Sequence, residues 1–368
     1  FWFQAAYALG YLVFGRIVDR VGARIGFTMA VIIWTLAHMA HGLARSAAQF
    51  MLARVALGIG ESGGFPASLK AVAEWFPQRE RALAIGIFNA GTNIGAVITP
   101  LIVPGLVLHY GWPAAFYVTG GFGLVWLLLW WILYRRPEES KRVSASELNY
   151  IRQDGPDPSA RLGWFAVMRY KETWAYAIAK FFIDPIWWFY LFWLPGYLFD
   201  RYHLDLLNFG LPIAAIYMIS DLGSMGGGWL SSALLARGVS VNLARKLSLL
   251  VFAIAVLPII GAQSVSGLWS AVAIIGLATA AHQAFSANIY ALPADLFPRS
   301  AVGSVVGIGG TAGAIGGMLF AKLVGAILDA SHNNYALLFA LAGGVYLVAL
   351  LAVHLLSPRL RQVKIEQV

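Results

Sequence analysis

Long apolar stretches follow one another along nearly the whole chain, from Phe1 to Leu356, and most charged residues lie in short clusters between them. A helix needs about 20 apolar residues to cross the roughly 30 Å hydrocarbon core of a bilayer, and most of these stretches are long enough. Charged residues make up 12% of the chain, against about 25% in an average soluble domain. The sequence therefore predicts an all-α polytopic membrane protein in a lipid bilayer, and it excludes a soluble enzyme or binding module.

Charge clusters and Pro/Gly turns divide the chain into about eleven segments of membrane-spanning length. The segments lie near residues 1–18, 26–44, 48–74, 81–108, 113–134, 172–199, 208–236, 243–263, 266–294, 301–328 and 334–357. We expect an N-terminal helical bundle over 1–134, a linker loop over 135–171, a C-terminal helical bundle over 172–357 and a tail over 358–368.

Basic residues are distributed unevenly over the connections between these segments. Most of the 26 Lys and Arg residues lie on alternate connections, in the linker and in the tail, whereas the opposite connections carry only Arg45 and Arg201. The positive-inside rule therefore predicts that the linker and the C-terminus are cytoplasmic. A nucleic-acid partner is excluded, because no soluble domain carries a basic face.

The two bundles are related by an internal repeat. Glu74-Trp75-Phe76-Pro77 leads on to Gly86, and at a constant offset of 221 residues Asp295-Leu296-Phe297-Pro298 leads on to Gly307. A weaker match pairs Gly15 with Gly228. In this register the second bundle has one helix more than the first. We therefore expect two parallel six-helix repeats, with the first helix of the first repeat preceding this chain. We expect a substrate site between the halves near the midplane.

Several stretches resemble a known family. Gly15-Arg16-Ile17-Val18-Asp19-Arg20-Val21-Gly22-Ala23-Arg24 is similar to the signature loop between the second and third helices of the major facilitator superfamily. Residues 54–61, Arg-Val-Ala-Leu-Gly-Ile-Gly-Glu, resemble the fourth helix of its anion:cation symporter family. Residues 184–195, 282–289 and 303–310 are similar to bacterial hexuronate transporters. The resemblance covers nearly the whole chain, apart from the family's first helix, and implies the major facilitator fold and a bacterial inner membrane.

Charged residues in the signature loop form the first candidate group. Asp19 can cap a helix end or pair with an Arg charge at the cytoplasmic side, and so hold one conformation. We expect Asp19, Arg20 and Arg24 to form a conformational latch.

Arg54 and Glu61 are seven residues apart, so they share one face of a helix about 10 Å apart along its axis. Placing a charged side chain near the bilayer centre costs about 2.5–3.5 kcal/mol of insertion free energy. Packing alone therefore does not explain either residue. One interpretation is an ion bridge that locks the half together. The other is that Arg54 binds the substrate carboxylate through its bidentate fork and Glu61 carries the coupling proton.

Lys180 and Asp184 are spaced to pair at i,i+4, early in a helix that Pro185 is expected to interrupt, and Asp221 lies in the next segment. We expect either a structural salt bridge near the cytoplasmic side or a substrate site and gate, with Lys180 binding substrate and Asp184 coupling protons.

Segment 266–294 carries a polar set suited to a polyhydroxylated ligand. Gln283, Ser286 and Tyr290 share one helical face, and His282 and Asn288 flank it. The alternative is hydrogen bonding between helices, which is common for such residues in membranes. His282 occupies the repeat position of Glu61. We expect His282, Gln283, Ser286 and Asn288 to bind substrate.

Three further substrate-binding candidates are Tyr7, Asn93 and Trp187. The family resemblance implies an aromatic residue in the cavity at Tyr7. Asn93 is a mid-span amide between Gly91 and Gly95. The Trp187 ring can stack on a sugar, although Trp also serves in interfacial belts and packing.

The resemblance implies a monomeric secondary transporter for proton-coupled uptake of a sugar acid, most specifically a hexuronate such as glucuronate or galacturonate, by alternating access. An alternative is another organic anion, such as an aldonate, an aldarate or an aromatic acid. A remote alternative is a membrane sensor, but the linker and tail are small for an output domain. No phosphate-binding loop, catalytic set or metal-ligand spacing is present in the sequence and Cys is absent, so we expect no enzyme activity and no cofactor other than the coupling proton.

Overall fold

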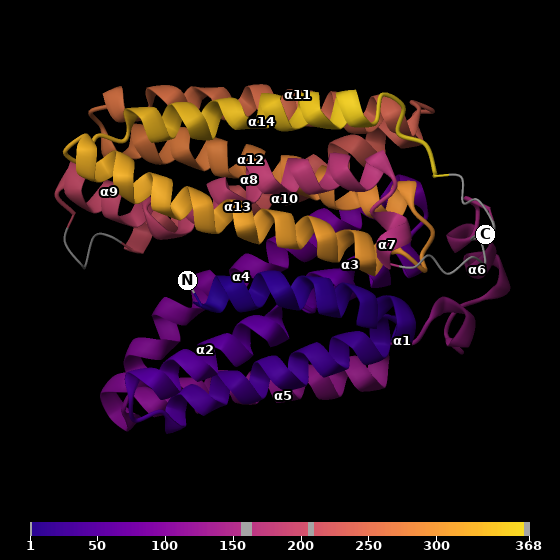
Figure 1. Ribbon diagram of the computed structural model, residues 1–368, viewed down its shortest axis with the longest axis horizontal. Coiled ribbons are helices and arrows are strands. Elements are labelled where there is room, and N and C mark those ends of the chain that lie inside the picture. Colours follow the sequence, from indigo (N-terminus) through magenta and orange to yellow (C-terminus); the bar gives the residue numbers. More distant parts are fainter. Residues whose placement is uncertain (1, 156–163, 205–209, 364–368) are drawn as a thin grey trace.

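The computed structural model describes residues 2–155, 164–204 and 210–363, apart from the side chains of residues 93, 96, 97, 100, 101 and 104. Within these ranges the regular elements are helices. They are α1 (Trp2–Ala40), η1 (His41–Leu43), α2 (Ala47–Glu61), α3 (Gly64–Trp75), α4 (Gln78–Tyr110), α5 (Trp112–Leu133), η2 (Pro137–Glu139), α6 (Ala145–Ile151), α7 (Trp164–Val167), α8 (Lys171–Phe192), α9 (Leu194–Tyr202), α10 (Gly210–Ala236), α11 (Val241–Val256), η3 (Leu257–Ser264), α12 (Leu268–Leu296), α13 (Val302–Ala330) and α14 (Ala336–Leu356). Figure 1 shows one bundle of α1–α5 and a second of α8–α14 lying side by side, with α6 and α7 of the linker at one end.

Helix α1 contains a reversal of the chain at Gly22. The backbone of Gly22 has φ 84°, a left-handed conformation that favours glycine. A side chain at Gly26 would collide with Val18, although eight residues of continuous helix span about 12 Å. The chain therefore turns back on itself here. The sequence predicted a loop between residues 18 and 26, whereas helical structure continues on both sides of this one glycine.

Two predicted segments are broken in the structure. Segment 48–74 consists of α2 and α3, which are separated at Ser62 and Gly63. Segment 172–199 consists of α8 and α9, which are bent by 44° relative to each other. The expectation that Pro185 interrupts the helix is wrong, because α8 continues through it to Phe192.

The surroundings of Pro185 explain this continuity. Proline cannot donate a hydrogen bond to the carbonyl one turn earlier, which is that of Phe181. Gly316 of α13 packs directly against the Phe181 carbonyl oxygen and the Pro185 ring. Close packing of a neighbouring helix therefore supports the turn that lacks this bond.

The halves meet through glycines that the repeat had paired. Gly15 of α1 packs against the backbone of Gly303 and Gly307 in α13, and Gly228 of α10 packs against the backbone of Ala82 in α4. Gly86 of α4 likewise packs against the backbone of α10 at Ser224. A side chain at these glycines would collide with backbone atoms. The repeat therefore preserves two close helix crossings, α1 with α13 and α4 with α10.

Six of the described helical stretches are long and apolar enough to cross a membrane, and α8 with α9 makes a seventh if the bent pair is one span. The six are Trp2–Leu43, Trp112–Leu133, Val241–Ser264, Leu268–Leu296, Val302–Ala330 and Ala336–Leu356. Trp2–Leu43 contains the reversal at Gly22 and is counted once. The number of about eleven spans stays a prediction.

Candidate functional site

A cavity of about 140 Å³ lies between the halves. Both halves contribute to its wall, through α1, α3 and α4 on one side and α8, α12 and α13 on the other. The lining residues are Phe3, Gln4, Tyr7, Tyr11, Phe65, Asn89, Thr92, Asp184, Trp187, Trp188, His282, Gln283, Ser286, Tyr290, Gly310 and Ala314. The predicted residues Tyr7, Asp184, Trp187, His282, Gln283 and Ser286 are therefore brought together at one place.

Lys180 and Asp184 form an ion pair at the edge of this cavity. Lys180 Nζ lies 2.7 Å from Asp184 Oδ1 and donates a hydrogen bond of 2.6 Å to Tyr290 Oη. The Lys180 side chain is fully buried, whereas that of Asp184 is 20% exposed and lines the cavity. The carboxylate of Asp184 and the Tyr290 hydroxyl thus lie next to the only buried ammonium among the described residues of α8.

Aromatic rings form much of the wall. Tyr7 stacks on Phe3 with ring centroids 5.6 Å apart and meets Tyr11 edge-on at 4.9 Å. Trp187 stacks on the His282 ring at 5.3 Å with an interplanar angle of 12°. Flat aromatic faces suit the C–H face of a sugar ring, and the hydroxyl and indole groups add polar edges.

Of the four residues of α12 predicted to bind substrate, three line the cavity and one does not. His282 Nδ1 lies 2.6 Å from Tyr346 Oη, which fixes the ring against α14. Gln283 and Ser286 also face the cavity. Asn288 is fully buried elsewhere, and its Nδ2 donates to the carbonyl oxygens of Gly227 and Ala284. The structure therefore places Asn288 at a contact between α10 and α12.

Asn89 of α4 is a cavity residue that the sequence reasoning missed. Its Nδ2 donates to Gln283 Oε1 at 2.6 Å and to Ser224 Oγ at 3.2 Å. The prediction had selected Asn93, one turn further along the same helix, whose side chain lies outside the described residues. Since residues four apart share a helical face, the spacing from Asn93 was the signal that could have identified Asn89.

Arg54 and Glu61 lie in a second, wider space of about 810 Å³. This space shares Phe3, Gln4 and Trp188 with the central cavity, so the two adjoin. Arg54 Cζ lies 6.0 Å from the centroid of the Phe3 ring. Neither Arg54 nor Glu61 forms an ion pair with a described residue. Both residues therefore line a space that adjoins the cavity.

Asp19 connects the halves at the opposite end of the cavity, which we term the latch end. Its carboxylate accepts hydrogen bonds from Gly303 N at 2.9 Å and Ser304 N at 2.6 Å, in the first turn of α13. Among the ion pairs of the described residues, the cation that pairs with Asp19 is Lys70, whose Nζ lies 3.1 Å from Oδ1. The first-turn N–H groups of a helix lack intrahelical partners, so a carboxylate is well placed there.

The two other predicted latch residues lie apart from this cap. Arg24 donates to the carbonyl of Trp131 at 2.7 Å, and its guanidinium lies 4.1 Å from the Trp131 ring centroid. Arg20 is exposed. Arg24 therefore ties α1 to α5 within one half.

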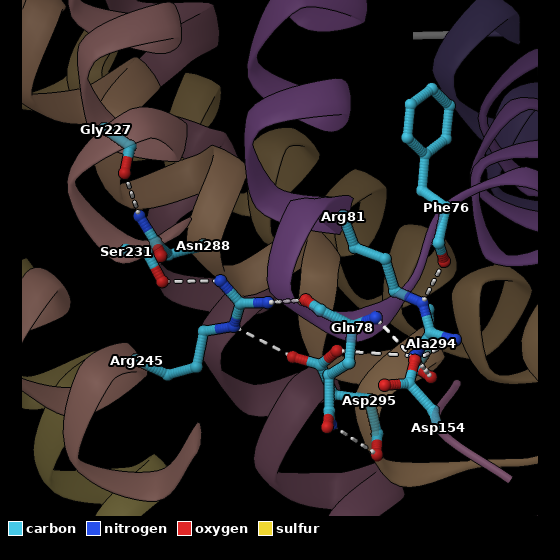
Figure 2. Close-up of polar contacts among 10 residues, drawn as sticks. All are labelled: Phe76, Gln78, Arg81, Asp154, Gly227, Ser231, Arg245, Asn288, Ala294 and Asp295. Atoms are coloured by element: carbon cyan, nitrogen blue, oxygen red, sulfur yellow. Dashed lines mark hydrogen bonds and ion pairs between the residues drawn. The ribbon is translucent and has the colours of Figure 1, made fainter. Parts of the chain in front are cut away.

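A second charged cluster joins the halves at the latch end. Figure 2 shows the Arg245 guanidinium between Asp295, Ser231 and the carbonyl of Gln78. Arg245 Nε donates to Asp295 Oδ2 at 2.8 Å. Arg81 Nη1 donates to the Ala294 carbonyl at 2.6 Å and lies 3.6 Å from Asp295 Oδ1. Because α4 belongs to the first half and α12 to the second, Arg81 ties the two together.

The linker also reaches this cluster. Asp154 Oδ2 accepts a hydrogen bond of 2.6 Å from Gln78 N, at the start of α4, and lies 3.8 Å from Arg81 Nη2. A carboxylate at a helix N-terminus is favourable for the same reason as at α13. The linker thus places a second acidic residue beside Arg81, in addition to Asp295.

The repeat positions Glu74 and Asp295 have different partners. Glu74 Oε2 accepts a hydrogen bond of 2.7 Å from Tyr134 Oη, while Asp295 pairs with arginines. Burial, followed by the neighbouring Glu74 carboxylate, raises the pKa of Tyr134, so the phenol stays protonated and donates.

A metal site is not formed by the part of the chain that the structure describes. No group of three or more His, Asp or Glu side chains there lies close enough together to hold an ion. The chemistry that this arrangement offers is binding by charge, hydrogen bonds and aromatic faces.

Residues 1–320 match the model of the Major Facilitator Superfamily. The chain is 31% identical over 336 residues to the hexuronate transporter of Escherichia coli (strain K12), covering 89% of this chain and 77% of that protein. It is 32% identical over 233 residues to the galacturonate transporter of Dickeya chrysanthemi, covering 62% and 68%. A solved structure of the proton:xylose symporter XylE, bound to 6-bromo-6-deoxy-D-glucose, shares the fold with a TM-score of 0.73 at 13% identity, covering 95% and 83%.

Proposed function

We propose, from the premise that this chain belongs to the Major Facilitator Superfamily, that it is a secondary transporter that takes up a sugar acid anion together with a proton. A hexuronate such as glucuronate or galacturonate is the specific substrate we propose. The observation that carries this proposal is the cavity between the halves, where the Lys180–Asp184 pair meets amide, hydroxyl and aromatic side chains. The relatives that are hexuronate and galacturonate transporters support the same substrate class.

The arrangement of charges suits an anion with several hydroxyl groups. Arg54, on the wide approach, attracts the carboxylate, and Lys180 beside the cavity is the second cation. Gln283 and Ser286 supply hydrogen bonds for hydroxyl groups, and Trp187 supplies a flat apolar face. A pocket of this kind fixes orientation with few polar groups in an otherwise apolar wall.

The contacts at the latch end support transport by alternating access. Asp19 and Arg81 hold the halves together there, while the wide space with Arg54 lies at the other end of the cavity. We propose that this is the conformation open to the outside of a protein in a bacterial inner membrane. The latch end, the linker and the C-terminus then face the cytoplasm. The unequal distribution of Lys and Arg supports this orientation.

Proton coupling is proposed to involve Glu61 and Asp184. Each is an acidic residue facing one of the two adjoining spaces, and each lies near a cation, Arg54 or Lys180. Binding of the substrate anion at the cation favours protonation of the neighbouring carboxyl, because the anion takes over the cation's charge. The loaded carrier then closes with fewer uncompensated charges.

We also propose that one further helix completes the first half as a six-helix repeat. An apolar groove of about 860 Å³ lies along α1, α3, α4 and α5, between rings that include Phe88, Phe122 and Trp126. In the second half α8 packs against α12, α13 and α14. In the repeat register, none of the described helices of the first half is the equivalent of α8. A longer chain would test this through cross-links between the added helix and Phe122.

The function is tested by uptake into proteoliposomes. Labelled glucuronate and galacturonate are offered with and without an imposed proton gradient, the protein being assayed as a monomer verified by light scattering. Accumulation above equilibrium only with the gradient is the expected result. Accumulation of an aldonate, aldarate or aromatic acid instead would favour the alternative substrates, and binding without transport would favour a sensor.

A further inference from the structure

A hydrogen bond between two amide side chains closes the inner part of the cavity. Asn89 on α4 and Gln283 on α12 belong to different halves, and both are 4% exposed. Asn89 Nδ2 donates to Gln283 Oε1 at 2.6 Å, and its second hydrogen is directed to Ser224 Oγ at 3.2 Å. Both amides also line the cavity. The bond is therefore an inter-half contact that a ligand can touch.

Each of these amides has one polar group left over. Among the described residues, Asn89 Oδ1 accepts no hydrogen bond and Gln283 Nε2 donates none, and neither atom is sealed away from the cavity. Exchanging oxygen and nitrogen on both amides would leave the same set of one acceptor and one donor. A hydroxyl group can donate to one and accept from the other at the same time.

We propose that Asn89 and Gln283 form an amide clasp that recognises a hydroxyl group of the substrate and keeps the halves together until that hydroxyl is bound. This inference rests on the proposed function. When the halves separate at the latch end, the clasp breaks and each amide loses this partner, which is unfavourable until another polar group replaces it. A bound hydroxyl supplies replacement partners and so lowers the barrier to opening.

The clasp adds a basis for selectivity that the charged residues do not provide. Arg54 and Lys180 attract any small carboxylate of suitable size. An anion without hydroxyl groups cannot bridge Asn89 Oδ1 and Gln283 Nε2, so it leaves the buried groups unpaired. The clasp therefore makes a polyhydroxylated anion the preferred cargo.

Competition counterflow on the full chain tests the ligand side of the proposal. Galacturonate is compared with cyclohexanecarboxylate, which has a six-membered ring and a carboxylate but no hydroxyl group. In Asn89→Ala and in Gln283→Ala, the preference for galacturonate is expected to fall about fivefold, the factor for one hydrogen bond of typical net strength. Asn334→Ala, which removes an amide in an exposed loop, serves as the matched control.

A distance measurement without ligand tests the gate side. The chain has no Cys, so spin labels can be attached to Val21→Cys and Arg237→Cys, at exposed positions of the two halves near the latch end. Both alanine variants are expected to increase the population with separated halves. The exchange Asn89→Gln with Gln283→Asn keeps the combined side-chain length and is expected to restore the closed population.

The outcomes separate the clasp from the transport function. If the alanine variants keep both the galacturonate preference and the distance distribution of the unaltered chain, the clasp is refuted. If the unaltered chain binds neither anion, the proposed function fails, and the ligand-free distances alone decide about the clasp. If an alanine variant does not fold, the double variant Asn89→Gln with Gln283→Asn is compared with each of its two single variants. If the closed population is equal in all three, the proposal is overturned.

Discussion

The carboxylate of Asp19 accepts a hydrogen bond of 2.6 Å from the backbone N–H of Ser304, although the two residues lie in different halves of the molecule. Asp19 is in α1 and Ser304 in the first turn of α13. A helix end in one half is thus capped by an acidic side chain of the other half. Any motion that separates the halves at this end must break the cap.

We predict that Asp19→Asn shifts the protein toward the conformation open at the latch end. Asparagine accepts only one of the two N–H groups and loses the negative charge that is favourable at a helix N-terminus, an interaction of about 0.3–2 kcal/mol, and about 1.4 kcal/mol corresponds to a tenfold change in an equilibrium. Spin-label distances across the latch end measure the shift. Asp329→Asn, an exposed change near the other end of α13, is the control. An unchanged distance distribution would show that the cap does not hold the halves together.

Arg245→Met is predicted to destabilise the fold. The Arg245 side chain is fully buried and pairs with Asp295, which is 1% exposed. Removing one partner of a buried ion pair costs about 3–5 kcal/mol when the remaining charge is left unpaired. Asp295 keeps Arg81 at 3.6 Å, so we expect a loss below that range, to which the lost hydrogen bonds to Ser231 and the Gln78 carbonyl contribute. Thermal unfolding in detergent should therefore show a clear decrease in melting temperature. Arg152→Met, which breaks an exposed pair with Glu138, should have little effect, and equal effects of the two changes would contradict the prediction.

The fold class and family were predictable because the relevant signals are local. Apolar length predicted helices, and residues 15–24 and 54–61 carried the resemblance that the match over residues 1–320 confirms. The paired glycines were also visible in the repeat. Their partners were not, since contacts such as Gly15 with Gly303 join residues far apart in sequence.

The candidate site was predictable only in part. Residue type and helical spacing selected Gln283 and His282, which line the cavity. The same criteria selected Asn288, whose amide binds backbone carbonyls between helices. Asn89 was missed because the partner that reveals its position, Gln283, comes 194 residues later. One-dimensional spacing gives the face of a helix but not the helix that this face meets.

Arg54→Lys is predicted to weaken uptake although it keeps the positive charge. The planar guanidinium binds a carboxylate through two parallel hydrogen bonds, which an ammonium cannot do. We expect the apparent affinity for the transported anion to fall severalfold, and Arg54→Ala to lower it further. Initial uptake rates measured over a range of substrate concentrations check this. Arg45→Lys, at an exposed connection, is the control, and an unchanged affinity in Arg54→Ala would remove Arg54 from the substrate route.

Glu61→Gln is predicted to separate exchange from accumulation. Glutamine resembles the protonated acid, so the variant should bind substrate and exchange it across the membrane, yet fail to concentrate it. Counterflow and proton-driven uptake are compared in the same vesicles, with Glu147→Gln in the linker as the control. If Glu61→Gln still concentrates substrate under a proton gradient, the coupling acid lies elsewhere.

Asp184→Asn is predicted to strengthen anion binding. Asp184 Oδ1 lies 2.7 Å from Lys180 Nζ and on its cavity side, so it competes with the substrate carboxylate for the buried ammonium. Asparagine keeps the shape but removes the competing charge, so the substrate becomes the counter-ion of Lys180. Because a hydrogen bond to a charged group contributes about 1.5–3 kcal/mol, affinity should rise about tenfold or more.

Lys180→Gln should produce the opposite change in affinity, since it leaves Asp184 to repel the substrate anion. Calorimetric titration with the transported anion measures both variants, and Asp200→Asn, at an exposed position in α9, is the control. Proton-driven accumulation should be lost in Asp184→Asn if protonation of this carboxyl releases Lys180 to the substrate. Weaker binding in Asp184→Asn would contradict the prediction. It would mean that Asp184 holds the Lys180 ammonium in position, and that Lys180 binds the substrate while it remains paired with Asp184.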